Sequence, residues 1–338
     1  MTRRTGMILA ATALLLLQAI LMGGCGKQTP QPGTAAVPAQ PAKPATPATE
    51  ATKTWKIGFA QTTLSEPWRV KMRDDMIAAA KEHADEVELI TNQADNDDAR
   101  QAANVEDLVT QGIDLLIISP HTAEGLTSVV EKVYDHGIPV ITLDRNIASD
   151  KYTCFIGADN KKIGALAAKV LAEKLGGKGI VFEIQGTLGA TATTDRHEGF
   201  IEAIKQWPDI KVIGGQSGDY AREPAQKLME DALQANDRID GVYAHNDEMA
   251  LGAMLAAERA GRLKDITIVG IDGQEEAMDA VAQGKMYATI IYPNGSAQAI
   301  ETALKILKGE EVPKKIELES ILVTKDNAND PDIRAHAF

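Results

Sequence analysis

Short apolar runs alternate with longer segments of mixed polarity from Trp55 to the end of the chain. The apolar runs predict β-strands over residues 55–60, 87–91, 113–119, 138–143, 153–158, 179–184, 210–216, 239–244, 266–271 and 287–291. The segments between them predict α-helices, among them residues 67–83, 99–111, 124–136, 161–175, 195–206, 222–235, 247–260 and 296–308. Nearly continuous apolar strands that alternate with helices are typical of parallel sheets covered on both faces. The pattern therefore predicts an α/β protein.

The length of the chain, 338 residues, favours more than one domain. A single sheet of ten strands is possible, but two sheets of about five or six strands suit this length better. The strands also fall into two series, and each series begins with a strand, a polar loop rich in Gly and Thr, and a helix. We therefore expect two similar α/β domains.

Residues 1–24 have the composition of an export signal. Arg3 and Arg4 precede an apolar stretch, residues 7–22, that is short for a membrane span. The small residues before Cys25 resemble the lipobox of bacterial lipoproteins, which implies cleavage after residue 24 and a lipid on Cys25. The protein would then be anchored in the cell envelope, in the periplasm or on the outer face of the cytoplasmic membrane. An ordinary secretory signal with a chance cysteine is the alternative.

The segment after Cys25 is expected to be a tether. Residues 26–53 contain six of the fourteen prolines and no aromatic residue, a composition typical of disordered linkers. The formal charge of the chain is −13, and removal of residues 1–24 would leave −15. Such an acidic balance argues against nucleic acid as a partner. The other cysteine, Cys154, lies in an apolar run and is expected to be a core residue without a disulfide.

Polar and aromatic residues gather where the predicted strands end. Ligands of parallel α/β sheets bind beyond the carboxyl ends of the strands, so these residues are candidates for a binding site. The candidates are Glu66, Trp68, Arg69, Asp144, Arg145, Arg196, Tyr220, Asn246, Asp272 and Tyr292. Carboxylates, arginines and amides suit sugar hydroxyls, which both donate and accept hydrogen bonds. Aromatic rings, here only 4% of the chain, suit the apolar faces of a sugar.

Two structural readings compete with this one. Asn246 could serve only as the N-cap of the helix predicted after it. Asp144 and Arg145 could form a solvated salt bridge where their strand stops. The number of polar strand ends in both series favours a neutral polyhydroxylated ligand.

Five motifs resemble those of the class I periplasmic sugar-binding proteins, the ribose- and galactofuranose-type receptors of ABC importers. The motifs are ITLDR, EIQGTLGATATTDRHEGF, QSGDYAR, AHNDEMALGA and VGIDG, and the resemblance runs from about Lys53 to about Lys325. The stretch Pro67-Trp68-Arg69 looks closest to the galactofuranose-binding branch. The resemblance implies two Rossmann-like, doubly wound parallel-sheet lobes joined by a three-strand hinge. We place the N-terminal lobe at residues 54–158 plus 292–322 and the C-terminal lobe at 159–291 plus 323–338.

The resemblance also implies roles for the candidate residues. Asp144 and Arg145 match the pair that binds sugar hydroxyls from the first lobe. The second lobe would supply Arg196, Asn246 and Asp272. Two aromatic residues that pack on the sugar ring are matched by Trp68 and Tyr220.

Three positions depart from the family pattern. Arg69 replaces a second aromatic residue that is common in ribose receptors, and Glu66 lies where those receptors often have Asn. Tyr292 falls near the position of a hinge glutamine, which puts the identity of the sugar in doubt.

A protein of this family is expected to be a monomer that closes on a monosaccharide and delivers it to an ABC permease, without a cofactor or metal. Three other functions compete with this one. A receptor that presents sugar to a chemotaxis or sensor-kinase partner fits the same residues. A glycosidase could use Asp144 and Asp272 as its carboxylate pair, but no catalytic motif is present. A repressor would need a DNA-binding domain in place of the signal and tether.

Overall fold

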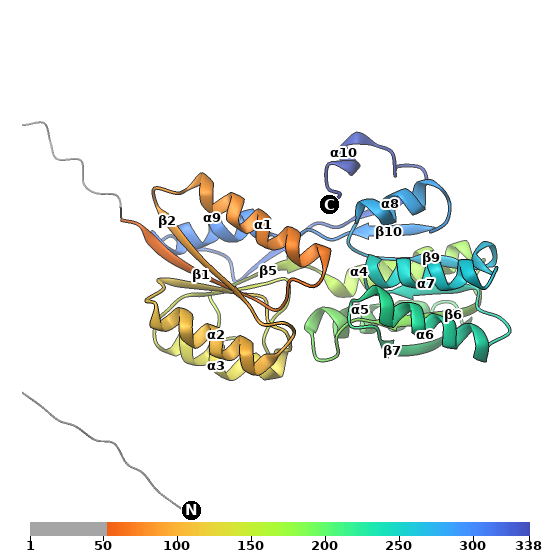
Figure 1. Cartoon of the computed structure of the whole chain (residues 1–338), viewed down its shortest axis with the longest axis horizontal. Coiled ribbons are helices and arrows are strands. Elements are labelled where there is room, and N and C mark those ends of the chain that lie inside the picture. The colour runs from red at the N-terminus through yellow and green to blue at the C-terminus, as the bar shows by residue number, and fades with distance from the viewer. Residues whose placement is uncertain (1–52) are drawn as a thin grey trace, which may run out of the picture. The chain divides into compact units, whose positions relative to one another are not determined.

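Two six-stranded sheets form the core of residues 53–338, the part of the chain that this computed structural model describes (Figure 1). The first sheet runs, edge to edge, through β11 (Lys315–Leu318), β5 (Cys154–Ala158), β4 (Val140–Leu143), β3 (Leu115–Ile118), β1 (Trp55–Gln61) and β2 (Val87–Gln93). The second runs through β12 (Ile321–Thr324), β10 (Ala288–Ile291), β9 (Thr267–Val269), β8 (Gly241–Ala244), β6 (Lys178–Gln185) and β7 (Asp209–Ser217). All of these ladders are parallel except that between β10 and β12. The prediction of two parallel α/β sheets is confirmed.

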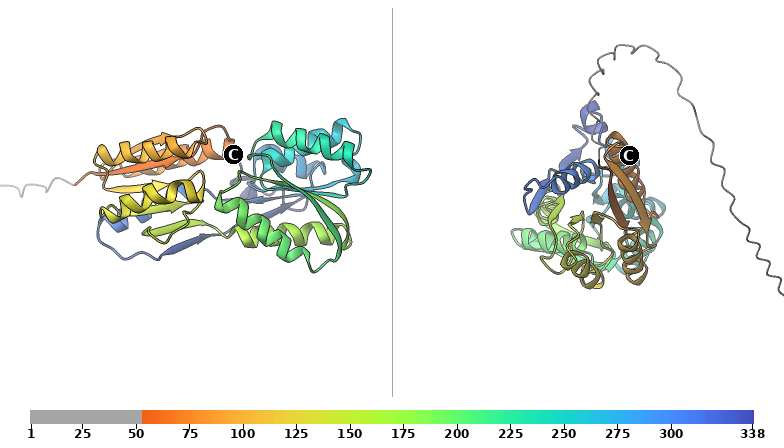
Figure 2. Two further views of the ribbon diagram at one scale, coloured as in Figure 1. Left: turned by 90° about the horizontal axis from the view of Figure 1, so that it is seen from below. Right: turned by 90° about the vertical axis from the view of Figure 1, so that its left-hand side faces the viewer.

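Four pairs of packed helices cover the faces of the two sheets (Figure 2). The pairs are α1 (Pro67–Glu82) with α9 (Ser296–Leu307), α2 (Asp98–Thr110) with α3 (Ala123–Asp135), α4 (Asn160–Lys174) with α5 (Thr191–Ile204), and α6 (Arg222–Ala235) with α7 (Asp247–Arg259). Below, the first sheet with α1, α2, α3 and α9 is called the first lobe. The second sheet with α4, α5, α6, α7 and α8 (Glu275–Ala282) is called the second lobe.

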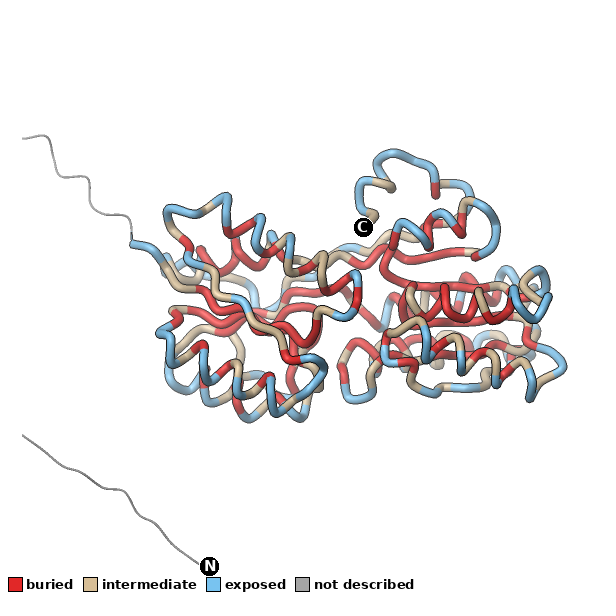
Figure 3. The backbone as a smooth tube through the Cα atoms, in the orientation of Figure 1, coloured by how far each residue is buried: buried red, intermediate tan, exposed pale blue. Residues whose placement is uncertain are grey.

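The apolar runs of the sequence correspond to the most deeply buried strands. Every residue of β3, β4, β8 and β10 is buried, because helices cover these central strands on both sides (Figure 3). The hydrophobic effect therefore fixes the register of each sheet. It also fixes where the strand ends lie, and these ends carry the polar residues of the candidate site.

Three segments of chain pass from one lobe to the other. The first joins β5 to α4, the second joins β10 to α9, and the third joins β11 to β12. In the third, β12 pairs with β10 from Ile321 onward, two residues before the limit of 323 that we set from the sequence. The lobe limits as a whole stay a prediction.

Some elements were not expected from the sequence. The short helices α8 and α10 (Pro331–Arg334), the 3-10 helix Leu263–Asp265 and the strand β11 lack a clear apolar run, and the apolar run of β12 is only three residues long. The helix predicted to begin at residue 195 begins at Thr191 instead, so Arg196 lies in its second turn.

The predicted signal, the lipidation site Cys25 and residues 26–52 of the tether lie outside the described residues. Between residues 53 and 338, no helix combines the length and the apolar character needed to cross a bilayer.

Candidate ligand-binding site

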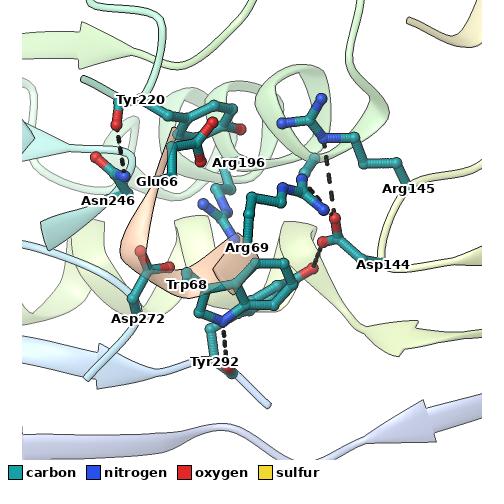
Figure 4. Close-up of a pocket in the computed structure, with 11 residues that line it drawn as sticks. Glu66, Trp68, Arg69, Asp144, Arg145, Arg196, Tyr220, Asn246, Asp272 and Tyr292 are labelled. Carbon is teal, nitrogen blue, oxygen red and sulfur yellow. Dashed lines mark hydrogen bonds and ion pairs between the residues drawn. The ribbon is translucent and has the colours of Figure 1, made fainter. Parts of the chain in front are cut away.

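A small cavity lies between the two lobes, and the structure brings all ten candidate residues to its wall (Figure 4). Ala192 of α5 completes the lining. The most exposed of the ten, Glu66, retains 8% of its accessible surface. The wall carries three arginines and three carboxyl groups, so its formal charges balance. A small, polar and nearly closed site of this kind suits a neutral ligand that makes many hydrogen bonds.

Asp144 is held in a buried network at the end of β4. One carboxylate oxygen lies 2.8 Å from Arg69 Nη2 and accepts from the Ser119 hydroxyl at 3.2 Å. The other accepts from the Tyr292 hydroxyl at 2.8 Å. Burial alone would raise the pKa of Asp144, but the guanidinium groups of Arg69 and Arg145 hold that pKa below its ordinary value. Asp144 is therefore an ionised residue that the protein already binds at both oxygens.

Arg145 has donors left for a ligand. Its Nη1 donates to the carbonyl of His121 at 3.0 Å, whereas its buried Nε has no hydrogen-bond partner among the described residues. Its Nε lies 3.9 Å from the Asp144 carboxylate, and its Cζ lies 5.3 Å from the centre of the Tyr220 ring. The pair Asp144-Arg145 is thus buried at the cavity, and it is not a solvated salt bridge at a strand end.

Arg196 is the corresponding guanidinium group of the second lobe. Its Nε donates to Asn160 Oδ1 at 2.8 Å, and its Nη1 donates to the carbonyl of His245. Its Cζ lies 4.5 Å from the centre of the Tyr292 ring. These contacts fix the plane of the group at the cavity wall, where the remaining nitrogen, Nη2, has no partner within residues 53–338.

Asn246 is the N-cap of α7 and also lies at the cavity wall. Its Oδ1 accepts from the Met249 amide at 2.9 Å and so caps α7, while the residue also lines the cavity. Its Nδ2 donates to the carbonyl of Tyr220 at 3.1 Å. The Tyr220 hydroxyl is bound in turn to Thr193 Oγ1 at 2.8 Å. Asn246 therefore holds the first turn of α7 and the backbone of Tyr220 together at the wall.

Glu66 and Asp272 are the two carboxyl groups of the wall whose side chains have no hydrogen-bond or ion-pair partner among residues 53–338. Figure 4 draws no hydrogen bond or ion pair from the other residues shown to either group. Burial raises the pKa of Glu66, and burial together with nearby Asp247 raises the pKa of Asp272 well above its ordinary value. Buried carboxyl groups without partners are costly. Ligand hydroxyls would offset that cost.

Three aromatic residues, Trp68, Tyr220 and Tyr292, line the cavity, and Trp68 and Tyr292 pack on each other. Their ring centres are 5.4 Å apart with the planes at 43°, and Trp68 Nε1 donates to the Tyr292 carbonyl at 2.9 Å. The indole lies across the cavity in Figure 4 and offers a flat apolar surface.

The backbone at the site is strained. The backbone φ angles of Asp144, Tyr220 and Asp272 are 66°, 58° and 131°. Residues other than glycine rarely adopt positive φ angles. Such residues cost about 1–3 kcal/mol each and cluster at functional sites. The strain directs side chains from three separate strand ends toward one cavity.

Asp247 was not predicted from the sequence, and it holds the loop beside Asp272 without lining the cavity. Its buried carboxylate accepts from the Gly273 and Gln274 amides at 2.8 and 2.9 Å and from the Thr289 hydroxyl at 2.7 Å. These bonds hold the loop that carries Asp272. Asn160 was also not predicted, although it is a polar residue that lies two positions after the end of β5.

The pKa of Asp247 leads to a prediction about stability. Burial raises it from 3.8 to about 7, so between these values the folded state keeps a proton that the unfolded state has released. Stability from this group therefore falls as pH rises through that window. We expect Asp247→Asn to remove this slope, so that the variant gains stability relative to the parent between about pH 4 and pH 7. Urea unfolding at several pH values measures the difference, and a constant difference would contradict it.

Metal binding finds no support in the described region. Between residues 53 and 338, no group of three or more His, Cys, Asp or Glu side chains is arranged to hold an ion.

Comparison with known proteins points in one direction. The family described as periplasmic binding protein domain matches residues 57–311. The ribose import binding protein RbsB of Bacillus subtilis is 34% identical over 309 residues, which cover 91% of this chain and 96% of that protein. The galactofuranose-binding protein YtfQ of Escherichia coli is 34% identical over 285 residues, which cover 81% and 89%.

A solved structure supports the fold as well. The fructose binding periplasmic domain of the hybrid two-component system BT1754 has a TM-score of 0.80 and 38% identity, with 83% of this chain and 94% of that chain covered. The ribose and the galactofuranose relative are both 34% identical to this chain, so sequence identity does not assign the chain to either branch.

Proposed function

Because the chain belongs to the class I periplasmic sugar-binding proteins, we propose that it captures a monosaccharide between its lobes and delivers it to an ABC permease. The composition of the cavity wall carries this proposal: balanced charges, free donors and acceptors, and an aromatic face, all nearly closed to solvent. The named relatives are a ribose import binding protein and a galactofuranose-binding protein. Pentoses, hexoses and similar polyols share the chemistry that this wall recognises.

Capture would depend on an equilibrium between open and closed forms. The lobes already touch outside the cavity, through the Ala123 amide to the Gly189 carbonyl at 2.9 Å and the Asn146 amide to Thr191 Oγ1 at 3.0 Å. A sugar that contacts both lobes binds the closed form better, and so shifts the equilibrium toward it. The permease would then recognise the closed form.

A thermal-shift screen of the purified protein against monosaccharides, furanose forms included, tests the proposal. A ligand present at a hundred times its Kd stabilises the fold by about 2.7 kcal/mol, which raises the Tm by several degrees. The stretch Pro67-Trp68-Arg69 favours a galactofuranose-type ligand as the first candidate. If no sugar or polyol raises the Tm, the proposal fails.

Arg145→Ala is expected to weaken sugar binding about tenfold or more, because each charge-assisted hydrogen bond contributes about 1.5–3 kcal/mol. Isothermal titration calorimetry measures the change. Arg100→Ala is a matched control, since Arg100 lies on the surface and pairs only with exposed Asp95. Equal affinities of Arg145→Ala and the control would exclude Arg145 from the site.

Presentation of sugar to a sensor is the second candidate function. The fructose binding domain that resembles this chain belongs to a two-component system. Uptake of labelled sugar separates the two functions: deletion of the gene abolishes uptake by an importer and leaves uptake unchanged for a sensor.

We further propose that residues 1–24 are removed and that Cys25 is lipidated, with residues 26–53 as a tether to the membrane. Mass spectrometry of the protein from its host would detect the acylated Cys25. Cys25→Ser should release the protein from the membrane, whereas retention of this variant would argue against the anchor.

A further inference from the structure

A continuous chain of hydrogen bonds connects the two lobes through the hinge. Arg196 in the second lobe donates to Asn160 Oδ1 at 2.8 Å, and Asn160 Nδ2 donates to the Tyr292 hydroxyl at 3.1 Å. That hydroxyl donates to Asp144 in the first lobe at 2.8 Å, and Asp144 binds Arg69 at 2.8 Å. Every hydrogen bond of this series joins two protein groups, so the series forms without a ligand.

The direction of each link is fixed by chemistry. An ionised carboxylate only accepts and an amide nitrogen only donates, so the single Tyr292 proton must point to Asp144. The side-chain amide of Asn160 thereby accepts from Arg196 in the second lobe and donates to Tyr292 in the hinge. Reversal of any link would leave a buried group unpaired, which costs about 1–3 kcal/mol.

The two middle residues lie in separate crossovers between the lobes. Asn160 is the first residue of α4, directly after β5, and Tyr292 directly follows β10. Asn160 is buried but does not line the cavity. It touches Arg196 and Tyr292, which do.

We propose that Asn160 is a positioning residue of the sugar site, and that with Tyr292 it forms a hinge latch that favours the closed form before sugar binds. The proposal rests on the function proposed above, because it assigns these residues to closure around a sugar. Two effects follow. The latch orients Arg196 toward the cavity, and it occupies one oxygen of Asp144.

The second effect bears on specificity. Since Tyr292, Arg69 and Ser119 already occupy three of the roughly four acceptor positions of Asp144, a sugar relies more on Glu66, Asp272 and the free donors of Arg145. The hydroxyl of Tyr292 thus substitutes for a ligand hydroxyl at this place in the wall.

Three variants test the latch. Asn160→Ala and Tyr292→Phe each break the series of hydrogen bonds between Arg196 and Asp144. Tyr292→Phe keeps the aromatic ring that packs on Trp68 and Arg196. Asn294→Ala is the control, because Asn294 lies in the same crossover and bonds to Asp75 at 2.8 Å, away from the cavity. Without sugar, small-angle X-ray scattering should give a larger radius of gyration for both latch variants than for the parent and the control. Saturating sugar should restore the parent value.

Affinity provides a second readout. Each latch variant should raise the sugar Kd about tenfold. The double variant should raise it little further, because the two residues belong to one chain. Effects that multiply to about a hundredfold, or latch variants that match Asn294→Ala in both Kd and radius of gyration, would overturn the proposal. The scattering comparison needs no sugar, so it tests the latch even if no sugar binds and the proposed function fails.

Discussion

Replacing Arg196 with alanine is expected to raise the Kd of the sugar about a hundredfold or more. Removal of one partner from a buried, hydrogen-bonded charge network costs about 2–5 kcal/mol, and 2.7 kcal/mol corresponds to about a hundredfold. The loss is large because the guanidinium group supplies a donor to the cavity and also partners Asn160 and the His245 carbonyl. It is also the only cation of the described wall that the second lobe contributes.

Isothermal titration calorimetry measures this change directly. Arg238→Ala serves as the control, because Arg238 is a largely exposed residue of the same lobe that pairs with Asp240. Arg196→Lys separates charge from geometry: it keeps the charge but loses the planar fork, and should recover only part of the affinity. An Arg196→Ala variant within threefold of the parent would contradict the assigned role.

Replacing Asp144 with alanine is expected to have the largest effect on stability, about 3–5 kcal/mol. The change leaves Arg69, which retains 3% exposure, as an uncompensated buried charge, and it removes the acceptor of the Tyr292 hydroxyl. Urea unfolding near neutral pH measures the loss. Asp95→Ala, which breaks the exposed pair with Arg100, should change little.

The pH dependence of this effect has a definite sign. The folded pKa of Asp144 is lowered, so its contribution to stability is present above its ordinary value of 3.8 and is lost as pH falls through the lower folded value. The difference between the parent and Asp144→Ala should therefore shrink in acid. A difference that grows as pH falls would contradict the buried ion pair.

The sequence was sufficient to predict the two sheets because their central strands are buried on both faces. The run Leu115–Ile118 is apolar throughout and Val140–Leu143 is apolar except for Thr142, and this gives a strong local signal. Strand β11 alternates exposed and half-buried residues, and α8 is only eight residues long, so tertiary packing rather than local pattern defines them.

The site could be predicted as a set of residues but not as a geometry. Strand ends of parallel sheets converge, and this rule predicted ten of the eleven residues that line the cavity, all except Ala192. It could not give the positive φ angles of Asp144 and Asp272, which tertiary contacts impose. Nor could it give the partners of Tyr292, since Asn160 and Asp144 are 132 and 148 residues away along the chain.

Binding of one sugar between the lobes is measured by a calorimetric titration with the sugar that gives the largest thermal shift. We expect saturable binding of one sugar per chain to the parent and to Arg238→Ala. We expect binding at least about a hundredfold weaker to Arg196→Ala. Failure of every sugar and polyol to bind, or equal affinity in all three proteins, would show that this cavity is not a sugar site.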